Sequence, residues 1–381
     1  MKNFNLPENV QYIIDTIEGN GYQAWCVGGC VRDIIMNKKV NDYDIASNCP
    51  ANKISSMFDK VIDTGIKHGT VTVVIDNENY EVTQYRIDGD YLDCRHPQNT
   101  TFTNDFSLDL SRRDFTMNAI GYHPKRGMFD PFDGQSAIKD RLIMAVGEPD
   151  LRFKEDALRI LRAFRFSSTL NFNIELSTKL AAVNNKHLLN NISRERIREE
   201  LFKLLGGENP SVLTHLLNVD LHLLNKIPNN SLVRFSSLCV ILNKNAYKTA
   251  VELKTDRFTR KLAGDIYDVL VSPVAKTKAD IKKQLCMLPQ DIWSSVLQAQ
   301  AVLNNKIYDN TMVKQIIDNK EPYLIKHLDI SSEEKKELSK IYSGQQVKEI
   351  FDTLVNYVIQ HPENNKKIIL KEIITQISTN S

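Results

Sequence analysis

The sequence contains no long apolar run and few cysteines, and both absences narrow the class of protein. No apolar stretch reaches the roughly 18–20 residues that a membrane-spanning helix needs. Only 6 of the 381 residues are cysteine and none form a CxxC pair, which argues against a disulfide framework and a cysteine zinc site. The first 20 or so residues have the spacing of an amphipathic helix and not of a signal peptide. We therefore expect a cytoplasmic protein with reduced thiols and no membrane association.

The composition is that of an ordinary globular protein, with 42% hydrophobic and 25% charged residues, and the length suggests two or three domains. The net charge of +2 conceals an asymmetry. Residues 1–150 contain 15 of the 49 Lys and Arg and 22 of the 47 Asp and Glu, which leaves 34 basic and 25 acidic residues for 151–381. An acidic first part suits metal ions and a basic remainder suits a polyanion such as nucleic acid, but surface charge also divides unevenly without a functional cause.

Residue spacing divides the chain into an α/β head and a long helical body. Residues 22–27 and 41–46 predict short strands, and 71–86 predict a β-hairpin with a turn-rich centre. Residues 87–111 are polar and lack periodicity, which predicts a long loop with a function of its own. From about residue 150 onward, apolar residues recur at spacings of three and four, which predicts helices. The predicted fold class is therefore α+β.

Three acidic residues on predicted strands are candidate metal ligands. Asp42 and Asp44 are two apart, so in a strand both carboxylates project from one face. Two like charges this close repel unless a cation lies between them, and hard oxygen ligands suit Mg²⁺. Glu81 completes the cluster if its strand lies beside that of Asp44. The alternative is a solvated strand end without a metal and an exposed Glu81 on an edge strand.

Two further motifs contain residues that could contact a nucleotide: a glycine pair followed by an arginine, and an arginine followed by an aspartate. Gly28 and Gly29 follow an apolar run and precede a helical pattern, where a backbone can approach a phosphate closely, and Arg32 adds a fork for phosphate oxygens. The motif is neither a Walker A loop nor a GxGxxG fingerprint, and a Gly-Gly pair is often an ordinary turn. Arg113 and Asp114 precede an apolar segment; they form either a solvated charge cluster or contacts to a triphosphate and a ribose.

The predicted helix over residues 152–166 carries an acid and several arginines. Asp156 and Arg159 are three apart and therefore neighbours on one helical face. They form either an exposed intrahelical ion pair or an acceptor and a donor fork that together read the edge of a base. Arg162 and Arg165 continue at the same spacing, which is more positive charge than a solvated stripe needs.

In this order the motifs resemble those of the class II tRNA nucleotidyltransferases, the CCA-adding enzymes, and of their bacterial poly(A) polymerase relatives. The stretches that carry the resemblance are VGGCVRDIIMNKKVNDYDIAS, EVTQYRIDGDYLDCRHP, DLSRRDFTMNAIGY, DPFDGQSAIKDRLI and FKEDALRILRAFRF, within about residues 22–205. The resemblance implies a DNA polymerase β-like head with a mixed or antiparallel sheet, followed by all-helical domains. The implied boundaries are 1–138 for the head, 139–206 for a base-recognising neck, 207–300 for a body and 301–381 for a tRNA-binding tail.

The resemblance also implies an activity and roles for single residues. The expected reaction adds CCA to the 3′ end of tRNA from CTP and ATP, with Mg²⁺ held by Asp42 and Asp44 and with release of pyrophosphate. Asp156 and Arg159 are implied to read the Watson–Crick edge of the nucleotide. The other implied nucleotide contacts are Gly28, Gly29, Arg32, Arg113, Asp114 (near the ribose), Arg162 and Arg165. Glu81 is added as a catalytic candidate from strand parity alone.

Several alternatives remain open at this stage. Relatives with the same base-reading pair add only A, only CC or a poly(A) tail. The full-length segment 87–111 favours complete CCA addition, because CC-adding relatives resemble this pattern with that loop shortened. A non-catalytic RNA-binding protein on the same scaffold would not need Asp42 and Asp44, and a small-molecule nucleotidyltransferase would not need the long basic helical half.

Overall fold

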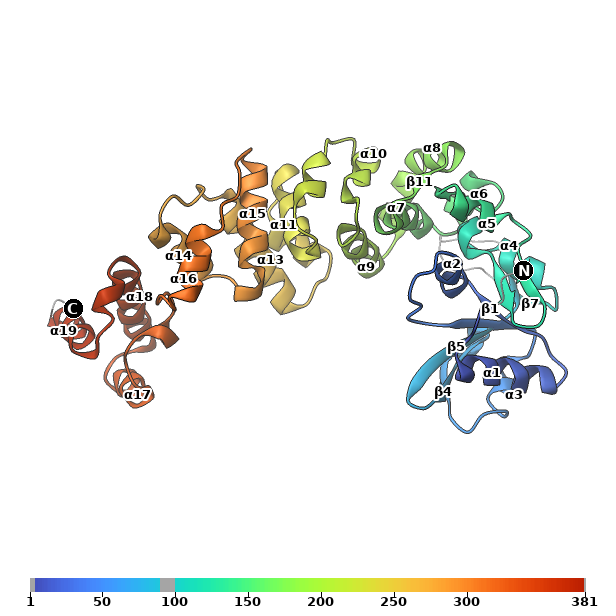
Figure 1. The fold of residues 1–381 in the computed structure, drawn as a ribbon, viewed down its shortest axis with the longest axis horizontal. Helices are drawn as coiled ribbons and strands as arrows, with labels where there is room; N and C mark the ends of the chain where they lie inside the picture. Colours follow the sequence, from blue (N-terminus) through green and yellow to red (C-terminus); the bar gives the residue numbers. More distant parts are fainter. Residues whose placement is uncertain (1–3, 90–99, 380–381) are drawn as a thin grey trace. The chain divides into compact units, whose positions relative to one another are not determined.

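The computed structural model describes residues 4–89 and 100–379, and the chain divides into two compact units, residues 1–220 and 221–381 (Figure 1). The first unit contains the sheet, and the second is built from helices. Within the described residues, no helix combines the length and the apolar character needed to cross a bilayer. The finer division into head, neck, body and tail stays a prediction.

A seven-stranded mixed sheet forms the centre of the first unit, in the order β3-β4-β5-β2-β1-β8-β9. Neighbouring strands are antiparallel except β2 and β5, which run parallel and pair Asp44 with Glu81. This sheet confirms the expected α+β fold. The strands are β1 Ala24–Val27, β2 Asp44–Ser47, β3 Val61–Gly65, β4 Thr70–Ile75, β5 Glu78–Gln84, β8 Gly121–His123 and β9 Gly127–Phe129.

Helices pack on this sheet and continue beyond it in the first unit. Helix α1 lies beside the sheet (Figure 1). It buries Val10, Ile13, Ile14 and Ile17 in one apolar core with the strand residues, as its amphipathic spacing predicts. The helices are α1 Glu8–Gly19, α2 Gly29–Ile35, α3 Ala51–Ile54, α4 Phe106–Ser111, α5 Gly134–Lys139, α6 Pro149–Glu155, α7 Leu158–Leu170, α8 Leu176–Asn184, α9 Arg194–Leu205 and α10 Thr214–Leu217.

The predicted hairpin is confirmed, and the predicted long loop is partly wrong. Strands β4 and β5 are joined at Asp76 and Asn77, which both have positive φ (51° and 62°), the backbone that a two-residue hairpin turn requires. Within 87–111, however, β6 (Arg86–Asp88) pairs with β7 (Thr100–Phe102), and α4 follows. These elements are too short to produce a periodic pattern. Residues 90–99 of the predicted loop lie outside the described residues.

The described part of the second unit contains α- and 3-10 helices and no strand, which confirms the predicted helical body. Three of its helices begin with a capping box, at Thr277, Ser331 and Ser343. The only strands beyond residue 140 in the described chain are the short pair β10 (Leu142–Ile143) and β11 (Asn173–Ile174). The helices are α11 Ser231–Ile241, α12 Ala246–Glu252, α13 Arg257–Val271, α14 Lys278–Leu285, α15 Trp293–Leu303, α16 Thr311–Asp318, α17 Ser332–Ile341, α18 Gly344–Gln360 and α19 Lys367–Thr379.

Candidate active site

A polar pocket of about 600 Å³ in the first unit brings the predicted residues together. Every predicted site residue lines it except Glu81, which lies one strand away from Asp44. Its size is that of a small-molecule site. The lining residues are Gly28, Gly29, Arg32, Asp42, Asp44, Arg112, Arg113, Asp114, Asn118, Asp156, Arg159, Arg162, Arg165, Phe166 and Lys203.

One side of the pocket carries carboxylates. Strand β2 begins at Asp44, so Asp42 precedes the strand instead of lying within it, but both residues line the pocket. Glu81 stands beside Asp44 in the parallel register of β2 and β5, where the parity argument expected it. Desolvation, followed by the charge of Glu81, raises the pKa of Asp44 to about 6; Asp42 adds to the rise and Arg113 opposes it. The charge of Arg113 therefore does not fully compensate the burial of Asp44 and the negative charge of Glu81.

The carboxylate side fits a divalent cation that is completed by other ligands. Among the described residues, no group of three or more His, Cys, Asp or Glu side chains is arranged to hold a metal ion. Asp42 and Asp44 supply hard oxygen donors, and burial together with the charge of Glu81 raises the pKa of Asp44, so its ionised form is poorly compensated by the protein alone. Mg²⁺ commonly binds one or two carboxylates and takes its remaining ligands from water and substrate phosphates, so this pair suits it.

The turn before α2 brings backbone against the same side chains. Gly28 has a φ of 76°, a left-handed conformation that favours glycine. A Cβ atom at Gly28 would lie 3.0 Å from Arg113 Nη1 and 3.9 Å from Asp44 Oδ2. The absence of a side chain therefore leaves space between the arginine and the carboxylate. Arg113 also lies 3.3 Å from the buried Asp109, measured from Nη2 to Oδ2.

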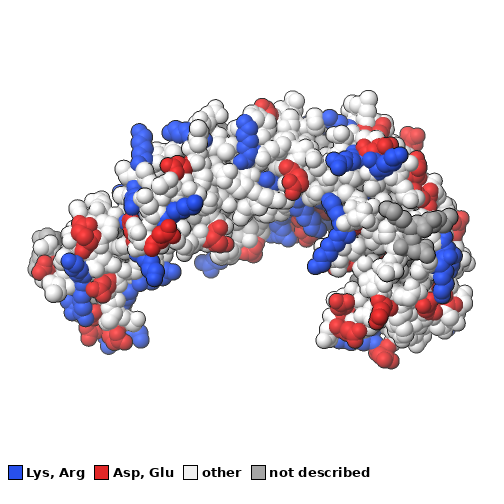
Figure 2. Space-filling model, viewed as in Figure 1, with Lys and Arg blue, Asp and Glu red and all other residues white. Residues whose placement is uncertain are grey.

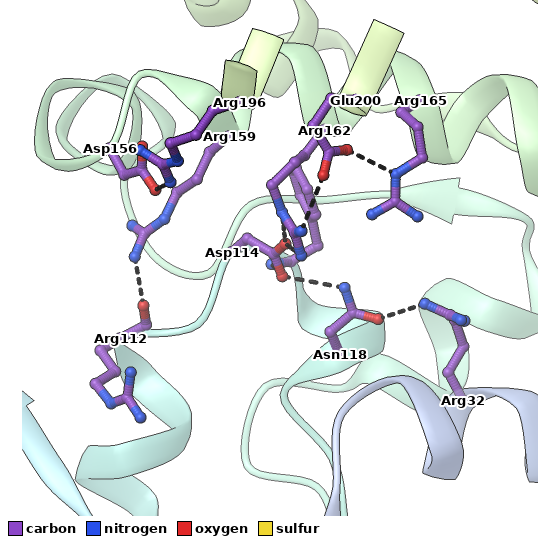
Figure 3. A network of polar contacts seen from close by, with 11 residues as sticks. Arg32, Arg112, Asp114, Asn118, Asp156, Arg159, Arg162, Arg165, Arg196 and Glu200 are labelled. Carbon is purple, nitrogen blue, oxygen red and sulfur yellow. Dashed lines mark hydrogen bonds and ion pairs between the residues drawn. The ribbon is translucent and has the colours of Figure 1, made fainter. Parts of the chain in front are cut away.

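Another part of the pocket is a network of arginines whose charges are paired (Figure 3). Arg32 Nη1 donates to Asn118 Oδ1 at 2.8 Å, and Asn118 Nδ2 donates to Asp114 Oδ1 at 3.0 Å. Arg162 donates through Nε (2.8 Å) and Nη2 (2.6 Å) to Asp114 Oδ2. Burial alone would raise the pKa of Asp114, but the charge of Arg162 and the bond from Asn118 lower it to about 2. Asp114 is therefore ionised and holds two neighbours in place.

Glu200 of α9 extends this network, and the sequence reasoning missed it. Its side chain is buried, accepts a bond from Arg165 Nε at 2.9 Å and lies 3.6 Å from Arg162 Nη1 (Figure 3). The guanidinium of Arg165 lies 3.5 Å from the ring centroid of Phe166, in a cation–π arrangement. A sequence signal for Glu200 exists: it is four residues before the buried Leu204, where the helix pattern requires an apolar residue.

The predicted helix over 152–166 is broken at Asp156. Helix α6 ends at Glu155 and α7 begins at Leu158, and Asp156 itself has an extended backbone (φ −134°, ψ 101°). Its Oδ1 accepts from the backbone N–H of Leu158 at 3.0 Å. An aspartate can bond nearby backbone in this way instead of continuing a helix, which explains the break.

Of the two alternatives for Asp156 and Arg159, the exposed intrahelical ion pair is therefore not formed, and both residues line the pocket. Asp156 Oδ2 accepts from Arg196 of α9 at 2.9 Å. Arg159 pairs with Glu155 (Nη1 to Oε2, 2.7 Å) and donates from Nη2 to the backbone oxygen of Arg112 at 2.7 Å. The acceptor and the donor fork are each held by a separate neighbour (Figure 3).

Comparison with known proteins gives two family matches within residues 24–229. Residues 24–144 match the family described as Poly A polymerase head domain, and 171–229 match the one described as Probable RNA and SrmB- binding site of polymerase A. The CCA-adding enzyme of Geobacillus thermodenitrificans (strain NG80-2) is 49% identical over 195 residues, 51% of this chain and 48% of that enzyme. The CCA-adding enzyme of Lactobacillus delbrueckii subsp. bulgaricus (strain ATCC 11842) is 45% identical over 197 residues, 52% of this chain and 50% of that enzyme. The chain thus spans about half the length of the curated relatives it matches.

Solved structures extend the similarity in fold to nearly the whole chain. The Bacillus stearothermophilus CCA-adding enzyme in complex with CTP is 29% identical, with a TM-score of 0.81 over 98% of this chain and 99% of that chain. The Thermotoga maritima CCA-adding enzyme complexed with tRNA_CCA is 18% identical, with a TM-score of 0.63 over 98% and 96%, and shows the fold alone. These matches confirm the resemblance seen in the sequence: residues 24–144 are similar to the poly A polymerase head domain, and about half of the chain is similar in sequence to CCA-adding enzymes.

Proposed function

We propose that the protein adds CCA to the 3′ end of tRNA, using CTP and ATP and releasing pyrophosphate. The observation that carries the proposal is the composition of one pocket. The pocket is lined by two carboxylates (Asp42 and Asp44), by arginines that are held by buried acids, and by the base-reading candidates Asp156 and Arg159. The CCA-adding enzymes among the similar proteins support this assignment.

Nucleotidyltransferases of this family normally use a divalent metal, and we propose Mg²⁺. Asp42 and Asp44 would hold it, with Glu81 adding negative charge from the neighbouring strand. When bound, Mg²⁺ favours deprotonation of the attacking hydroxyl and neutralises charge on the phosphate oxygens. In the proposed reaction the 3′-oxygen of the tRNA bonds to the α-phosphorus of the nucleotide, its proton passes to solvent, and the bond to pyrophosphate breaks.

The remaining residues position the nucleotide. Arg32 and Arg113, with the backbone at Gly28 and Gly29, would contact the triphosphate, and Asp114 would lie near the ribose. Phosphoryl transfer depends mainly on such positioning and on electrostatic stabilisation. Arg162 and Arg165 line the same pocket and would add positive charge for further contacts.

The base-reading role follows from hydrogen-bond complementarity. Cytosine and adenine both present an amino donor beside a ring-nitrogen acceptor on the Watson–Crick edge. A carboxylate acceptor from Asp156 and a guanidinium donor from Arg159 would complement that order. Uracil and guanine present a carbonyl acceptor beside an N–H donor, which is the reverse order. One pair of side chains would therefore accept both CTP and ATP and reject the other two nucleotides.

A tRNA partner also agrees with the charge of the chain. The second unit contains 23 Lys and Arg against 17 Asp and Glu, which favours a polyanion. A tRNA substrate would place the protein in the cytoplasm. A-adding, CC-adding and poly(A)-adding activities, and RNA binding without catalysis, are the outcomes to be distinguished.

The test is incorporation of labelled CTP and ATP, separately and together, into tRNA that ends before CCA, in the presence of Mg²⁺. We expect two C residues followed by one A. Addition of A alone to tRNA ending in CC, of CC alone, or of a long A tail would each contradict complete CCA addition. Asp42→Ala should abolish incorporation and leave tRNA affinity unchanged, whereas a wild type that binds tRNA without incorporating nucleotides would favour the binding-only function.

A further inference from the structure

The net positive charge of the second unit comes from its first part alone. Residues 221–261 contain 8 Lys and Arg and only 2 Asp and Glu, whereas 262–381 contain 15 of each. Figure 2 agrees, because blue and red side chains are interspersed over the last helices, α17–α19, at the left of the view. The segment 301–381, expected from the resemblance to bind tRNA, contains 11 basic and 11 acidic residues and has no net charge to offer.

The charged side chains of this first part lie on and beside a packed pair of helices, α12 and α13. Lys244, Lys248, Arg257 and Lys261 are all exposed. Within the chain that the structure describes, no ion pair joins Lys244, Lys248 or Arg257 to a carboxylate. These cations are therefore available to an external anion, unlike the arginines of the pocket.

Two exposed aromatic residues accompany the cations. Phe258 is 69% exposed and Tyr247 is 46% exposed, and the described part of the second unit has no other exposed Phe, Tyr or Trp. Tyr247 lies against α13, because a Cβ atom at Gly264 would meet Tyr247 Cβ at 3.2 Å. Both rings are therefore partly open to solvent, and they lie in the same segment of the chain as the exposed cations.

We propose that the α12–α13 surface (Lys244, Tyr247, Lys248, Arg257, Phe258 and Lys261) binds structured RNA. The cations would contact backbone phosphates, and an exposed ring would stack on an unpaired base. This inference rests on the proposed function, in which the RNA is the tRNA substrate, and it adds a binding surface that shares no residue with the pocket. It places this RNA-binding surface on α12 and α13, in the part of the second unit that carries its net positive charge.

Alternative partners fit the surface less well. A protein partner that needs an apolar patch would find only three large exposed apolar side chains, Tyr247, Val251 and Phe258, among at least four cations in residues 244–261. An anionic membrane would be attracted by the charge but would gain little from Phe258 as an isolated apolar side chain. RNA uses both features, because every base has a face on which an aromatic ring can stack.

The experiment removes three positive charges from the α12–α13 surface and compares the effect on tRNA binding with that of removing three positive charges from another part of the second unit. The test variant is K244Q/K248Q/R257Q, and the control is K336Q/K340Q/K348Q, three exposed lysines on α17 and α18. Binding of tRNA lacking CCA is measured for the full chain over a series of salt concentrations. The test variant should bind at least tenfold more weakly, and its slope of log affinity against log salt should fall by about 0.7 to 0.9 for each phosphate that the variant no longer neutralises. The control should change both quantities little.

Phe258→Ala tests the stacking part against Ile341→Ala, whose side chain is 70% exposed. We expect about a tenfold loss of tRNA affinity for the first and none for the second. The KM for CTP should be unchanged in all four variants, because none of the substituted residues lines the pocket. If the test and control substitutions changed tRNA affinity equally, or if the slope of log affinity against log salt stayed the same, the proposal that this surface binds RNA would be wrong.

Failure of this inference is separable from failure of the proposed function. If wild type incorporates nucleotides and the test variants bind tRNA normally, the surface is wrong and the function stands. If wild type incorporates nothing but the K244Q/K248Q/R257Q variant loses RNA binding, the surface stands and the function is wrong. Binding of vesicles containing anionic lipid in preference to tRNA would overturn the assignment to RNA.

Discussion

Two aspartates that line the pocket, Asp44 and Asp114, have pKa values that are shifted in opposite directions. On the carboxylate side, Asp44 stands beside Glu81 and near Asp42, and its pKa is raised to about 6. On the arginine side, Asp114 is bonded by Arg162 and Asn118, and its pKa is lowered to about 2. One acid is destabilised when ionised, and the other is stabilised.

This difference indicates two kinds of part within one site. The paired side is complete in the free protein, so it can hold its arginines in fixed positions before a ligand arrives. The carboxylate side is incomplete, because burial and the charge of Glu81 destabilise ionised Asp44 and Arg113 offsets this only in part. A site built in this way loses stability at Asp44 and gains binding energy for a cation there.

The largest effect on activity should come from Asp44→Asn, which replaces one oxygen ligand of the proposed metal with an amide nitrogen and keeps the shape of the side chain. We expect nucleotide incorporation to fall by at least about 10³-fold, because the oxygen donors proposed for the metal are reduced. The stability of the free protein should rise at pH 7 by about 1 kcal/mol, a value discounted because solvent screens this accessible carboxylate.

The pH dependence has a definite sign. The pKa of Asp44 rises from 3.8 to about 6 on folding, so its destabilising effect is absent below about pH 3.8 and complete above about pH 6. Urea unfolding of wild type and Asp44→Asn at pH 4 and pH 7 measures this. Loss of stability in the variant at pH 7 would show that Asp44 is compensated in the free protein. Asp63→Asn, at an exposed position on β3, is the control.

Asp114→Asn should have the opposite effect on stability. Removing the charge deprives Arg162 of the carboxylate oxygen, Oδ2, that accepts two of its hydrogen bonds, and we expect a loss of about 3 kcal/mol in the free energy of unfolding. Because the folded pKa is lowered to about 2, the contribution of Asp114 is complete above its ordinary value of 3.8 and is lost as the pH falls towards 2. Urea unfolding from pH 2 to 7 measures the loss, with the exposed Asp140→Asn as the control. Equal stability of Asp114→Asn and wild type at pH 7 would contradict the comparison.

Local patterns predicted the parts of the fold that are determined locally. The β4–β5 hairpin follows from alternating β-formers around a turn, and the glycine turn before α2 follows from Gly28 and its neighbour. The position of Glu81 beside Asp44 followed from strand parity and needed only the pairing of β2 with β5. The placement of the predicted site residues around one pocket followed from the motifs that carry the family resemblance.

Partner choice among the charged residues could not be predicted from spacing. Asp156 and Arg159 are three apart, but Asp156 pairs with Arg196, 40 residues away. Arg159 has one near partner, Glu155, and one distant partner, the backbone of Arg112, 47 residues away. Spacing describes only the neighbours within one helix, and here the capping bond to Leu158 ends that helix. Glu200 was missed for the same reason, since its partners lie on another helix.

Glu200→Gln tests whether the arginine side needs its distant acid. The amide keeps the shape but weakens the hold on Arg165, so that guanidinium should become mobile. We expect the KM for nucleotide to rise about tenfold, with a smaller change in kcat, because a binding group is less well positioned. Glu199→Gln on the same helix, at an exposed position, is the matched control. An unchanged KM in the presence of lower stability would assign Glu200 to folding alone.

The smallest effect should come from Arg196→Gln, which separates base selection from overall activity. Arg196 holds Asp156 Oδ2, while the bond from the backbone of Leu158 holds Oδ1. The substitution therefore leaves Asp156 attached at one oxygen and free to turn at the other. We expect misincorporation of UTP and GTP relative to CTP and ATP to rise about fivefold, with a smaller loss of CTP incorporation, because selectivity depends on the orientation of the acceptor. Arg194→Gln, two residues earlier and exposed, should leave selectivity unchanged. A uniform fall in the incorporation of all four nucleotides would mean that Arg196 joins α9 to the base-reading segment without setting its specificity.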